Sequence, residues 1–306
     1  MSISSEVIAP KPSGGPDKDW PHRDLYDRVV HALYILPSRF RTKLRIAGVA
    51  ATDLFTLNTP LGAAIEQNVV ENLNELRPLW DPDQRYESYS FVRQPQAFPD
   101  VRLQSAAPES PDRIIMGIEL KGWFVLSKEG EPSFRYKISS AACQPQDLLA
   151  VFPWQLDEVI SGTPQLMRPY ITEAKYAAEH RNYYWEHVKG AGGSVKVAEG
   201  AAPYPLKNDK FNDVGVPDAG GNFGRVARGG LMSDFIEQLL LEQMSGIPAK
   251  HWQAFLKIFS DGANADSIDK KLLKIKNELT GDSYLVDPEL DNFLIALKEF
   301  LERRSN

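Results

Sequence analysis

Residues 98–121 read FPDVRLQSAAPESPDRIIMGIELK, and the rest of the chain is organised around this stretch. Asp100 lies in one short β-prone run, and Glu119 and Lys121 lie two residues apart in a second, strongly β-prone run. Because side chains alternate along a strand, Glu119 and Lys121 are expected to point to the same face of a sheet. Two carboxylates and an amine can therefore converge, which is the minimum set for holding a divalent cation beside a water that attacks a phosphodiester.

The pattern of an acidic residue, any residue and a lysine is weak on its own. It occurs three times in this chain, at Glu119/Lys121, Glu173/Lys175 and Asp269/Lys271. Only the first pair lies in a predicted strand, and only the first follows a β-prone run that carries a Pro-Asp pair. The other two lie in helical patterns, where such residues are commonly solvated. The site is therefore assigned to the first pair.

The composition is that of an ordinary soluble protein. The chain has 306 residues, of which 42% are hydrophobic and 25% charged, so it can bury a sizeable core. Its single cysteine, Cys143, excludes an intramolecular disulfide and fits a reducing compartment. No secretion signal or membrane span is evident, so we expect a cytoplasmic protein with no membrane partner. The net charge of −6 weighs mildly against a purely electrostatic nucleic-acid binder, although basic residues can still gather on one face.

The N-terminal part divides into an arm and a helix. Residues 1–20 are rich in proline and glycine and are predicted to form a mobile arm. A helix is expected over 23–45, with an interruption near Pro37. The densest basic cluster of the chain lies at the end of this helix and comprises Arg39, Arg41, Lys43 and Arg45. Two interpretations of the cluster are open, a solvated helix end or a surface that faces phosphates.

Thr59-Pro60 marks the start of the next helix, LGAAIEQNVVENLNEL, with Thr59 as the N-cap and Pro60 at the first helical position. The apolar residues of this helix share one face at helical spacing: Leu61, Ile65, Val69 and Leu73. We expect that face to pack on a sheet. Glu66 flanks the stripe, and its spacing alone indicates a surface carboxylate.

The hydrophobic period changes from helical to alternating after Pro82. Strands are predicted at 86–93, 98–104, 113–127, 134–139 and 147–154. The last of these, DLLAVFPW, is almost entirely apolar, which is typical of a buried strand and compatible with a parallel one. A helix followed by several strands and a final inner strand indicates an α/β protein with a mixed sheet.

The C-terminal half reads as helical apart from one long interruption. A helix is predicted over 173–188, and residues 190–231 are so rich in glycine and proline that we expect a long loop, which in a compact domain is usually functional or disordered. Amphipathic helices are expected after it at 232–245, 249–260, 266–279 and 288–303. Because they carry no distinctive chemistry, we interpret 232–306 as a helical region for packing, a lid or oligomer contacts.

The helix predicted over 173–188 carries two features that invite a functional interpretation. His180 and His187 lie two helical turns apart, which is too far for joint zinc binding without another element. The aromatic run Tyr183, Tyr184 and Trp185 can stack on nucleic-acid bases or belong to the core, and the core is the commoner role. We assign no metal to this helix.

Pro99-Asp100 followed by Glu119-Leu120-Lys121 resembles the signature of the PD-(D/E)xK nuclease superfamily. The phrases FPDVRL and GIELKGWFVLSKEGEPSFRY are similar to those of type II restriction endonucleases in that superfamily. The resemblance covers about residues 59–155. It implies a restriction-endonuclease-like α/β fold, in which a mixed central sheet is flanked by helices and a helical C-terminal region packs on the core. The nuclease core with its N-terminal helices would then span 21–189.

The resemblance also implies roles for individual residues. Asp100 and Glu119 are expected to bind Mg²⁺, with the carbonyl of Leu120 as a further ligand. Lys121 is expected to orient or deprotonate the attacking water, with a pKa lowered by the metal and by a partly dry cleft. Glu66 lies in the helix that resembles the first core helix of the family, which in many members carries an auxiliary acidic residue. It would therefore hold a water of the metal or a second metal.

Two alternatives to this assignment stay open at the level of sequence. A second Pro-Asp pair, Pro111-Asp112, precedes Glu119 by only seven positions. We prefer Asp100, because it is expected inside its own strand and can meet Glu119 across a strand pair. The other alternative is that the three residues are purely structural, with Asp100 and Lys121 as a buried ion pair, although the cost of burying charge makes that less attractive.

The function that the resemblance implies is a Mg²⁺-dependent type II restriction endonuclease that cuts double-stranded DNA as a homodimer. Alternatives are a repair or modification-dependent nuclease of the same fold, or a non-catalytic DNA-binding module. Arginine can pair with guanine and asparagine with adenine, so residues 190–231 are candidates for contacting DNA, or else form a flexible surface loop. The expected DNA-contact residues are Lys207, Lys210, Asn222, Arg225 and Arg228, with Arg39 and Arg41 as further candidates.

Overall fold

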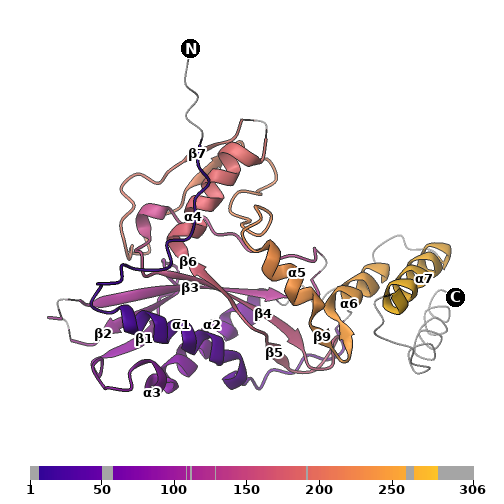
Figure 1. Ribbon diagram of the computed structural model, residues 1–306, viewed down its shortest axis with the longest axis horizontal. Coiled ribbons are helices and arrows are strands. Elements are labelled where there is room, and N and C mark those ends of the chain that lie inside the picture. The colour runs from indigo at the N-terminus through magenta and orange to yellow at the C-terminus, as the bar shows by residue number, and fades with distance from the viewer. Residues whose placement is uncertain are drawn as a thin grey trace, which may run out of the picture.

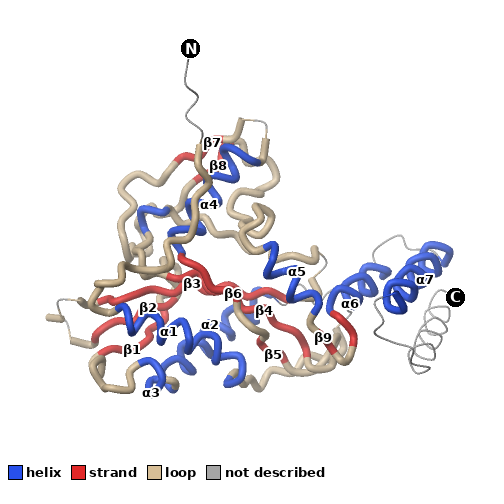
Figure 2. Tube along the Cα trace, in the orientation of Figure 1, coloured by secondary structure: helices blue, strands red, loops and turns tan. Residues whose placement is uncertain are grey.

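The computed structural model describes residues 7–49, 58–107, 109–110, 112–127, 129–190, 192–259 and 265–281. Within them, a mixed six-stranded sheet lies between two groups of elements (Figures 1 and 2). Helices α1 (Arg23–Arg39), α2 (Asn58–Glu75) and the short α3 (Arg77–Trp80) pack together on one side, and α4 (Ala174–Tyr183) rises from the other. The α/β class predicted from the sequence is confirmed.

The sheet consists of β1 (Tyr89–Arg93), β2 (Val101–Ser105), β3 (Ile114–Phe124), β4 (Leu148–Leu156), β5 (Pro164–Leu166) and β6 (Tyr170–Glu173). Its order is β1-β2-β3-β4-β5, and β6 pairs with the first half of β4. β3 and β4 run parallel, whereas the other pairs in the sheet are antiparallel. Most side chains of β4 are buried, as expected for a parallel strand covered on both faces. The predicted buried parallel strand is confirmed.

Helix α2 supplies the apolar stripe that the sequence predicts. Leu61, Ile65, Val69 and Leu73 are all buried in the main core. The helix begins at Asn58, one residue before the predicted N-cap at Thr59. The end of Ile65 lies 3.5 Å from the position that a Cβ atom of Gly122 would occupy, so α2 covers the face of β3 to which Gly122 belongs.

The helix predicted over 23–45 is too long. α1 ends at Arg39, two residues after Pro37, which lies inside the helix but has no N–H to continue its hydrogen bonding. The chain then leaves the helix at Phe40 and forms an isolated bridge between Ile46 and Gly162. Phe40 and Ile46 are both buried. Burying these two side chains requires an extended path, which explains why the helical pattern does not persist.

One predicted strand starts too early, and another is wrong. The strand predicted over 86–93 begins only at Tyr89, because the backbone N–H of Tyr86 is held in a turn by the Asp81 carboxylate. Residues 134–139 form no regular strand, and only Ile138 forms a bridge, with Asn212. The backbone of this β-prone run is instead bonded to a distant segment: Tyr136 N–H donates to the Gly224 carbonyl at 2.7 Å and Ser139 N–H to the Phe211 carbonyl at 2.8 Å.

The segment 190–231, predicted as a long loop, is folded against α4 at the top of Figure 1. It contains a small antiparallel pair, β7 (Ser194–Lys196) and β8 (Val214–Val216). The buried side chain of Asp213 accepts a hydrogen bond from Arg181 Nη2 at 2.6 Å and one from the Ala198 N–H at 2.9 Å. Phe223 is completely buried. The flexible-loop interpretation is therefore wrong for the described part of this segment.

The N-terminal arm is attached to the core in the part that the structure describes. The Glu173 carboxylate accepts hydrogen bonds from the N–H groups of Ser13, Gly14 and Gly15 at 3.0, 2.7 and 2.9 Å, and from the Ser13 hydroxyl at 2.8 Å. Gly14 and Gly15 have φ values of +85° and +91°, which favour glycine and turn successive N–H groups toward one anion. The expected mobile arm over 1–20 is therefore attached to the core at residues 13–15, and residues 1–6 lie outside the described part.

This attachment predicts a pH-dependent stability. Burial alone would raise the pKa of Glu173, but the hydrogen bonds from Ser13 to Gly15 outweigh it and lower the pKa below its ordinary value of 4.5. The stabilisation is therefore fully present above pH 4.5 and is lost as the pH falls through the lowered pKa. We expect Glu173→Gln to melt at a lower temperature than the wild type at pH 7, because its amide NH₂ would face the arm's donors. This difference should shrink as the pH falls below 4.5.

The measurement is thermal unfolding followed by circular dichroism from pH 7 to acid, with Glu179→Gln as the matched control. Glu179 and the arm line the same surface pocket. The hydrogen bonds described above from the N–H groups of the arm go to Glu173 and not to Glu179. A deficit of Glu173→Gln that stayed constant with pH would contradict this role of the carboxylate.

The C-terminal helices extend the fold to the right of Figure 1. They are α5 (Ser233–Leu241), α6 (Ala249–Leu256) with a 3₁₀ turn η4 (Lys257–Phe259), and α7 (Ala265–Gly281), and a small hairpin of β9 (Gln243–Met244) and β10 (Ile247–Pro248) separates the first two. Leu239, Met244 and Ala249 join the main core, whereas α7 packs on α6 through a separate cluster around Ile258 and Ile275. The helix predicted over 288–303 lies outside the described residues.

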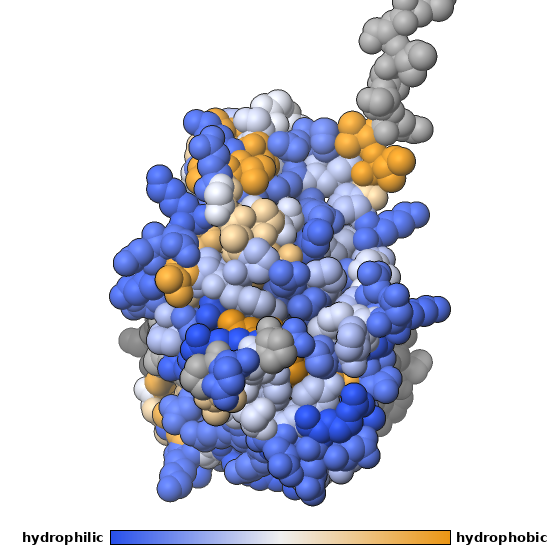
Figure 3. All heavy atoms as spheres, turned by 90° about the vertical axis from the view of Figure 1, so that its left-hand side faces the viewer, coloured by the Kyte–Doolittle hydropathy of each residue, from blue (hydrophilic) through white to orange (hydrophobic). Residues whose placement is uncertain are grey.

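Two surface properties bear on the class of protein. No helix in the described part of the chain is long and apolar enough to cross a membrane. The face at the left of Figure 1 is mostly hydrophilic where it is coloured, and its hydrophobic residues show in separate groups (Figure 3). On that face, the visible surface is therefore mainly suited to contact with water and polar partners.

Candidate active site

Glu119 and Lys121 lie on one face of β3, as predicted. Lys121 Nζ is 2.6 Å from Glu119 Oε1 and 3.5 Å from Asp100 Oδ2, so one ammonium group contacts both carboxylates. Gly122, which faces α2, has the opposite orientation in the alternation along the strand. The three residues therefore meet on the sheet face away from α2.

Asp100 lies directly before β2 and not inside it, which corrects the sequence prediction. The pairing of β2 with β3 ends at Val101 opposite Ile118, so Asp100 is the next residue along, beside Glu119. Its Oδ2 accepts a hydrogen bond from the Leu120 N–H at 2.8 Å. The Asp100 carboxylate therefore accepts the hydrogen bond that a backbone carbonyl would accept if the pairing of β2 with β3 continued.

Gly117 allows the chain to bring Asp100 to this position. A Cβ atom on Gly117 would collide with the ring of Pro99, so only glycine lets this proline pack directly on β3. The carbonyl of Phe98, the residue before Pro99, accepts a hydrogen bond from Arg102 Nη2 at 3.0 Å. Arg102 is buried and also donates to the Pro205 carbonyl at 3.0 Å. These contacts fix the turn that carries Asp100.

The site is partly accessible, and its three charges do not cancel. The side chains of Glu119, Lys121 and Asp100 are 8%, 19% and 22% exposed. Burial raises the pKa of Glu119 to about 7, although Lys121 opposes the shift. Burial alone would lower the pKa of Lys121, but the attraction of Glu119 and Asp100 outweighs it and raises the pKa above its ordinary value. The expected lowering of the lysine pKa depends on a bound metal; without one, the two carboxylates within 3.5 Å of the ammonium group raise the pKa instead.

Glu66 makes a different contact from the one expected. Its Oε2 accepts a hydrogen bond from Arg93 Nη2, at the end of β1, at 2.7 Å. The Glu66 side chain is 26% exposed, so it is more buried than a free surface carboxylate. It is still near enough to Lys121 to contribute to the raised pKa of the lysine. The structure thus places Glu66 beside the site as a member of an ion pair.

The residues present fit a magnesium ion that keeps water or substrate among its ligands. Among the described residues, no group of three or more His, Cys, Asp or Glu side chains could hold a metal on its own. Mg²⁺ is commonly bound by only one or two carboxylates together with waters and phosphate oxygens. In a strand, the N–H and C=O of one residue point to the same side. Because the Leu120 N–H reaches Asp100, its carbonyl is directed to that side too.

The alternative assignment through Asp112 is disfavoured. Asp112 is 63% exposed and lies 3.5 Å from His22 Nε2. Its carbonyl accepts a hydrogen bond from the Tyr89 hydroxyl at 2.8 Å. These contacts hold Asp112 against α1 and β1, and Pro111 lies outside the described residues. The Asp100–Lys121 pair that the structural alternative requires is present, but Glu119 shares the same ammonium group.

The predicted DNA-contact residues are only partly brought together. Asn222, Arg225 and Arg228 form one cluster, in which Arg228 Nη1 donates to Asn222 Oδ1 at 2.9 Å. Lys207 and Lys210 are exposed in a separate turn of the same segment. Arg39 and Arg41 are exposed at the end of α1. The aromatic run of the α4 region divides, because Trp185 is buried in the π-helical turn η3 (Tyr184–Val188) while Tyr183 and Tyr184 are partly exposed.

Sequence reasoning missed Asp147, a buried carboxylate next to the site. Its Oδ1 accepts a hydrogen bond from the Gly117 N–H at 2.7 Å, and its Oδ2 accepts one from the Gln144 N–H at 2.8 Å. Burial raises its pKa to about 6, against the effect of these hydrogen bonds. Asp147 immediately precedes the apolar run of β4. Pairing that run with β3 in parallel would have placed the carboxylate beside the site.

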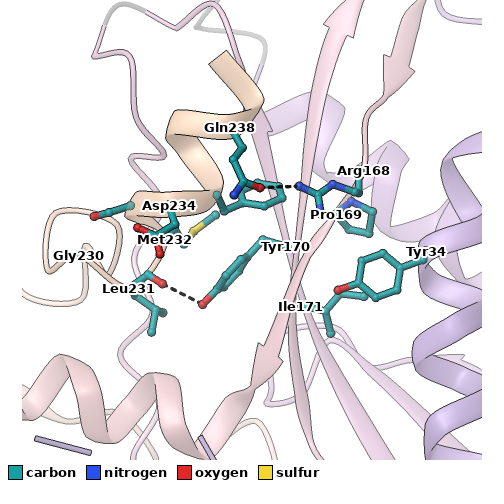
Figure 4. A pocket seen from close by; sticks show the side chains of 12 residues that line it. Tyr34, Arg168, Pro169, Tyr170, Ile171, Gly230, Leu231, Met232, Asp234 and Gln238 are labelled. Carbon is teal, nitrogen blue, oxygen red and sulfur yellow. Dashed lines mark hydrogen bonds between the residues drawn. The ribbon is translucent and has the colours of Figure 1, made fainter. Parts of the chain in front are cut away.

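A separate pocket of about 350 Å³ lies between α1, β6 and the start of α5 (Figure 4). In it, Arg168 Nη2 donates to Gln238 Oε1 at 3.4 Å, and the Tyr170 hydroxyl donates to the Leu231 carbonyl at 2.9 Å. None of the site residues predicted from the sequence lines this pocket. We assign it no part in the chemistry of Asp100, Glu119 and Lys121.

Comparisons of the chain with protein-family models, with curated proteins and with solved structures find no match.

Proposed function

We propose that the protein is a Mg²⁺-dependent endonuclease of the type II restriction kind, which hydrolyses phosphodiester bonds in double-stranded DNA at a specific short sequence. The observation that carries the proposal is the contact of one ammonium group, Lys121 Nζ, with the carboxylates of both Glu119 and Asp100. This contact lies where β2 ends beside β3, so that among the described residues no strand pairs with the second half of β3 on that side. The arrangement supports a restriction-endonuclease-like version of the α/β fold.

The charge balance favours a cation site over a purely structural ion pair. Two carboxylates and one ammonium leave an excess negative charge in a largely buried place, and Glu66 is already neutralised by Arg93. Uncompensated charge of this kind is costly in a protein interior. A divalent cation between Asp100 and Glu119 would favour the ionised form of Glu119, whose pKa burial raises.

Each residue has a distinct part in the proposed reaction. Asp100, Glu119 and the Leu120 carbonyl would hold the ion, and bound Mg²⁺ supplies Lewis-acid polarisation of the phosphoryl oxygen. In its protonated form, Lys121 would provide positive charge next to the phosphoryl oxygens as negative charge grows on them. It would also orient the attacking water by donating a hydrogen bond to the water oxygen. To accept a proton from that water, the other role expected for it, Lys121 would need a pKa lowered by the bound cation.

The substrate and assembly follow from the same proposal. Cutting both strands at a palindromic sequence needs two active sites related by two-fold symmetry, so we propose a homodimer. The test is incubation of purified protein with supercoiled plasmid. Discrete fragments with Mg²⁺ and intact plasmid with a chelator are the expected results. Intact plasmid under both conditions, for several plasmids of different sequence, would contradict the proposal.

A further inference from the structure

A basic pocket lies between the end of α4 and the segment 222–229. Its volume is about 190 Å³. Four of its lining side chains are cationic, namely Arg181, Lys189, Arg225 and Arg228, and no Asp or Glu is among the described residues that line it. In a chain with a net charge of −6, such a concentration of positive charge marks this surface as distinct. An anionic ligand is the chemistry that fits it.

One donor in the pocket is not used by the protein. The Arg225 Nε is buried and has no hydrogen-bond partner among the described residues. The Trp185 ring, which is only 2% exposed, forms part of the pocket wall. Lys189 Nζ lies 3.2 Å from the centre of that ring and is held there by the ring alone in the contacts described. A buried donor without a partner is costly, and an anion supplies the acceptor that it lacks.

Two glutamates occupy the outer sides of the pocket's arginines. Glu129 Oε2 lies 3.1 Å from Arg225 Nη1 and 2.8 Å from Arg228 Nη2, and Glu131 Oε1 lies 2.9 Å from Arg228 Nε. Guanidinium groups recognise carboxylates and phosphates in the same forked geometry. Glu129 and Glu131 come from the turn directly after β3, the strand that carries Glu119 and Lys121. The carboxylates of Glu129 and Glu131 therefore bind the same guanidinium groups that a phosphate would bind.

These ion pairs are exposed enough to be exchanged. The side chains of Glu129, Glu131 and Arg228 are 43%, 33% and 37% exposed, whereas that of Arg225 is 18% exposed. Exposed pairs of this kind contribute little to stability. Arg181 differs, because it is bound to the buried Asp213 and holds the pocket wall in place. A polyanion can thus replace the glutamates without unfolding the wall.

We propose that this basic pocket binds a backbone phosphate of DNA, and that Glu129 and Glu131 occupy Arg225 and Arg228 until DNA displaces them. The choice of DNA as the source of the phosphate rests on the proposed function. The pocket itself rests on the arrangement of the four cations and the two glutamates. Lys189, which the sequence does not single out as a phosphate ligand, becomes part of the contact.

The test measures binding of a short fluorescent DNA duplex by anisotropy in a chelator, so that no cleavage takes place. The double variant Glu129→Gln/Glu131→Gln should bind about three- to tenfold more tightly than the wild type, because its arginines are released. The matched control is Glu199→Gln/Glu237→Gln, which removes the same charge from two exposed glutamates elsewhere. The control should bind within about twofold of the wild type.

The complementary variant is Arg225→Ala/Arg228→Ala, for which we expect binding at least about tenfold weaker and a salt dependence shallower by about one ion. Loss of binding can follow from misfolding, whereas the gain expected for the glutamate variant cannot. Equal binding by the glutamate variant and its control would overturn the proposal. Binding of the arginine variant at the wild-type level would also overturn it.

Two further comparisons complete the test. One distinguishes DNA from free phosphate as the ligand, and the other distinguishes failure of the pocket proposal from failure of the nuclease proposal. Inorganic phosphate, titrated into the wild-type complex, should displace the duplex only at far higher concentration than unlabelled DNA; displacement at equal concentration of phosphate groups would contradict a DNA-backbone site. If the glutamate variant gains affinity but no DNA is ever cut, the nuclease proposal fails and the pocket stands. If DNA is cut but affinity is insensitive to these residues, the pocket fails alone.

Discussion

Lys121→Ala is expected to lower Mg²⁺-dependent DNA cleavage by at least about a thousandfold while DNA binding is retained. Lys121 is the cation that contacts both Glu119 and Asp100, at 2.6 and 3.5 Å, so its removal eliminates the positive charge of the proposed active site. The side chain is 19% exposed, and its loss leaves the apolar core of β3 and β4 untouched. Cleavage rates at saturating Mg²⁺ and duplex binding in a chelator measure the two effects separately.

The matched control for this variant is Lys175→Ala. Lys175 belongs to Glu173-Ala174-Lys175, which has the same acid–any–lysine pattern but lies at the start of α4, where Lys175 is exposed. It should cut DNA at the wild-type rate. If Lys121→Ala cut as fast as this control, the assignment of β3 as the catalytic strand would be wrong.

Asp213→Ala is expected to lower the free energy of unfolding by about 3–5 kcal/mol, because it leaves a buried guanidinium without its counter-charge. Arg181 and Asp213 are 3% and 0% exposed and lie 2.6 Å apart. Asp213 also holds Asn182 Nδ2 at 3.1 Å and the Ala198 N–H at 2.9 Å, so its removal releases the segment 190–231 from α4. Urea unfolding gives the size of the effect, and limited proteolysis shows whether cleavage begins in that segment.

Asp209→Ala provides the comparison within the same segment. Asp209 is exposed and accepts one local hydrogen bond from the Leu206 N–H at 2.8 Å. Its replacement should cost less than about 1 kcal/mol. An Asp213→Ala variant that unfolds at the same urea concentration as Asp209→Ala would show that the Arg181–Asp213 pair does not hold the segment.

Features with a local repeat were predictable from the sequence. The buried face of α2 follows from apolar residues three and four positions apart, and the shared face of Glu119 and Lys121 follows from strand alternation. β4 was recognisable as a buried strand because its residues are apolar on both faces. In each of these cases the physical cause lies within a few residues of its effect.

Features that depend on distant partners were not predictable. Ser13 and Glu173 are 160 positions apart, and neither carries a local signal of the other. The β-prone run 134–139 fails as a strand because its backbone groups bond to residues between 211 and 224. The contact between Lys121 and Asp100 likewise depends on the turn that carries Asp100, which is fixed by the packing of Pro99 on Gly117. All three features depend on tertiary contacts, and such contacts leave no periodic pattern in the sequence.

The central claim is that Asp100 and Glu119 bind the cation that DNA hydrolysis requires. The measurement that tests it most directly is the rate of plasmid cleavage as a function of Mg²⁺ concentration, for the wild type and for Asp100→Asn. We predict that wild-type cleavage is absent in a chelator and saturates with Mg²⁺. Asp100→Asn, which keeps the shape of the side chain but loses its charge, should show little cleavage at any Mg²⁺ concentration. Cleavage by the wild type in a chelator, or identical Mg²⁺ curves for the two proteins, would contradict the claim.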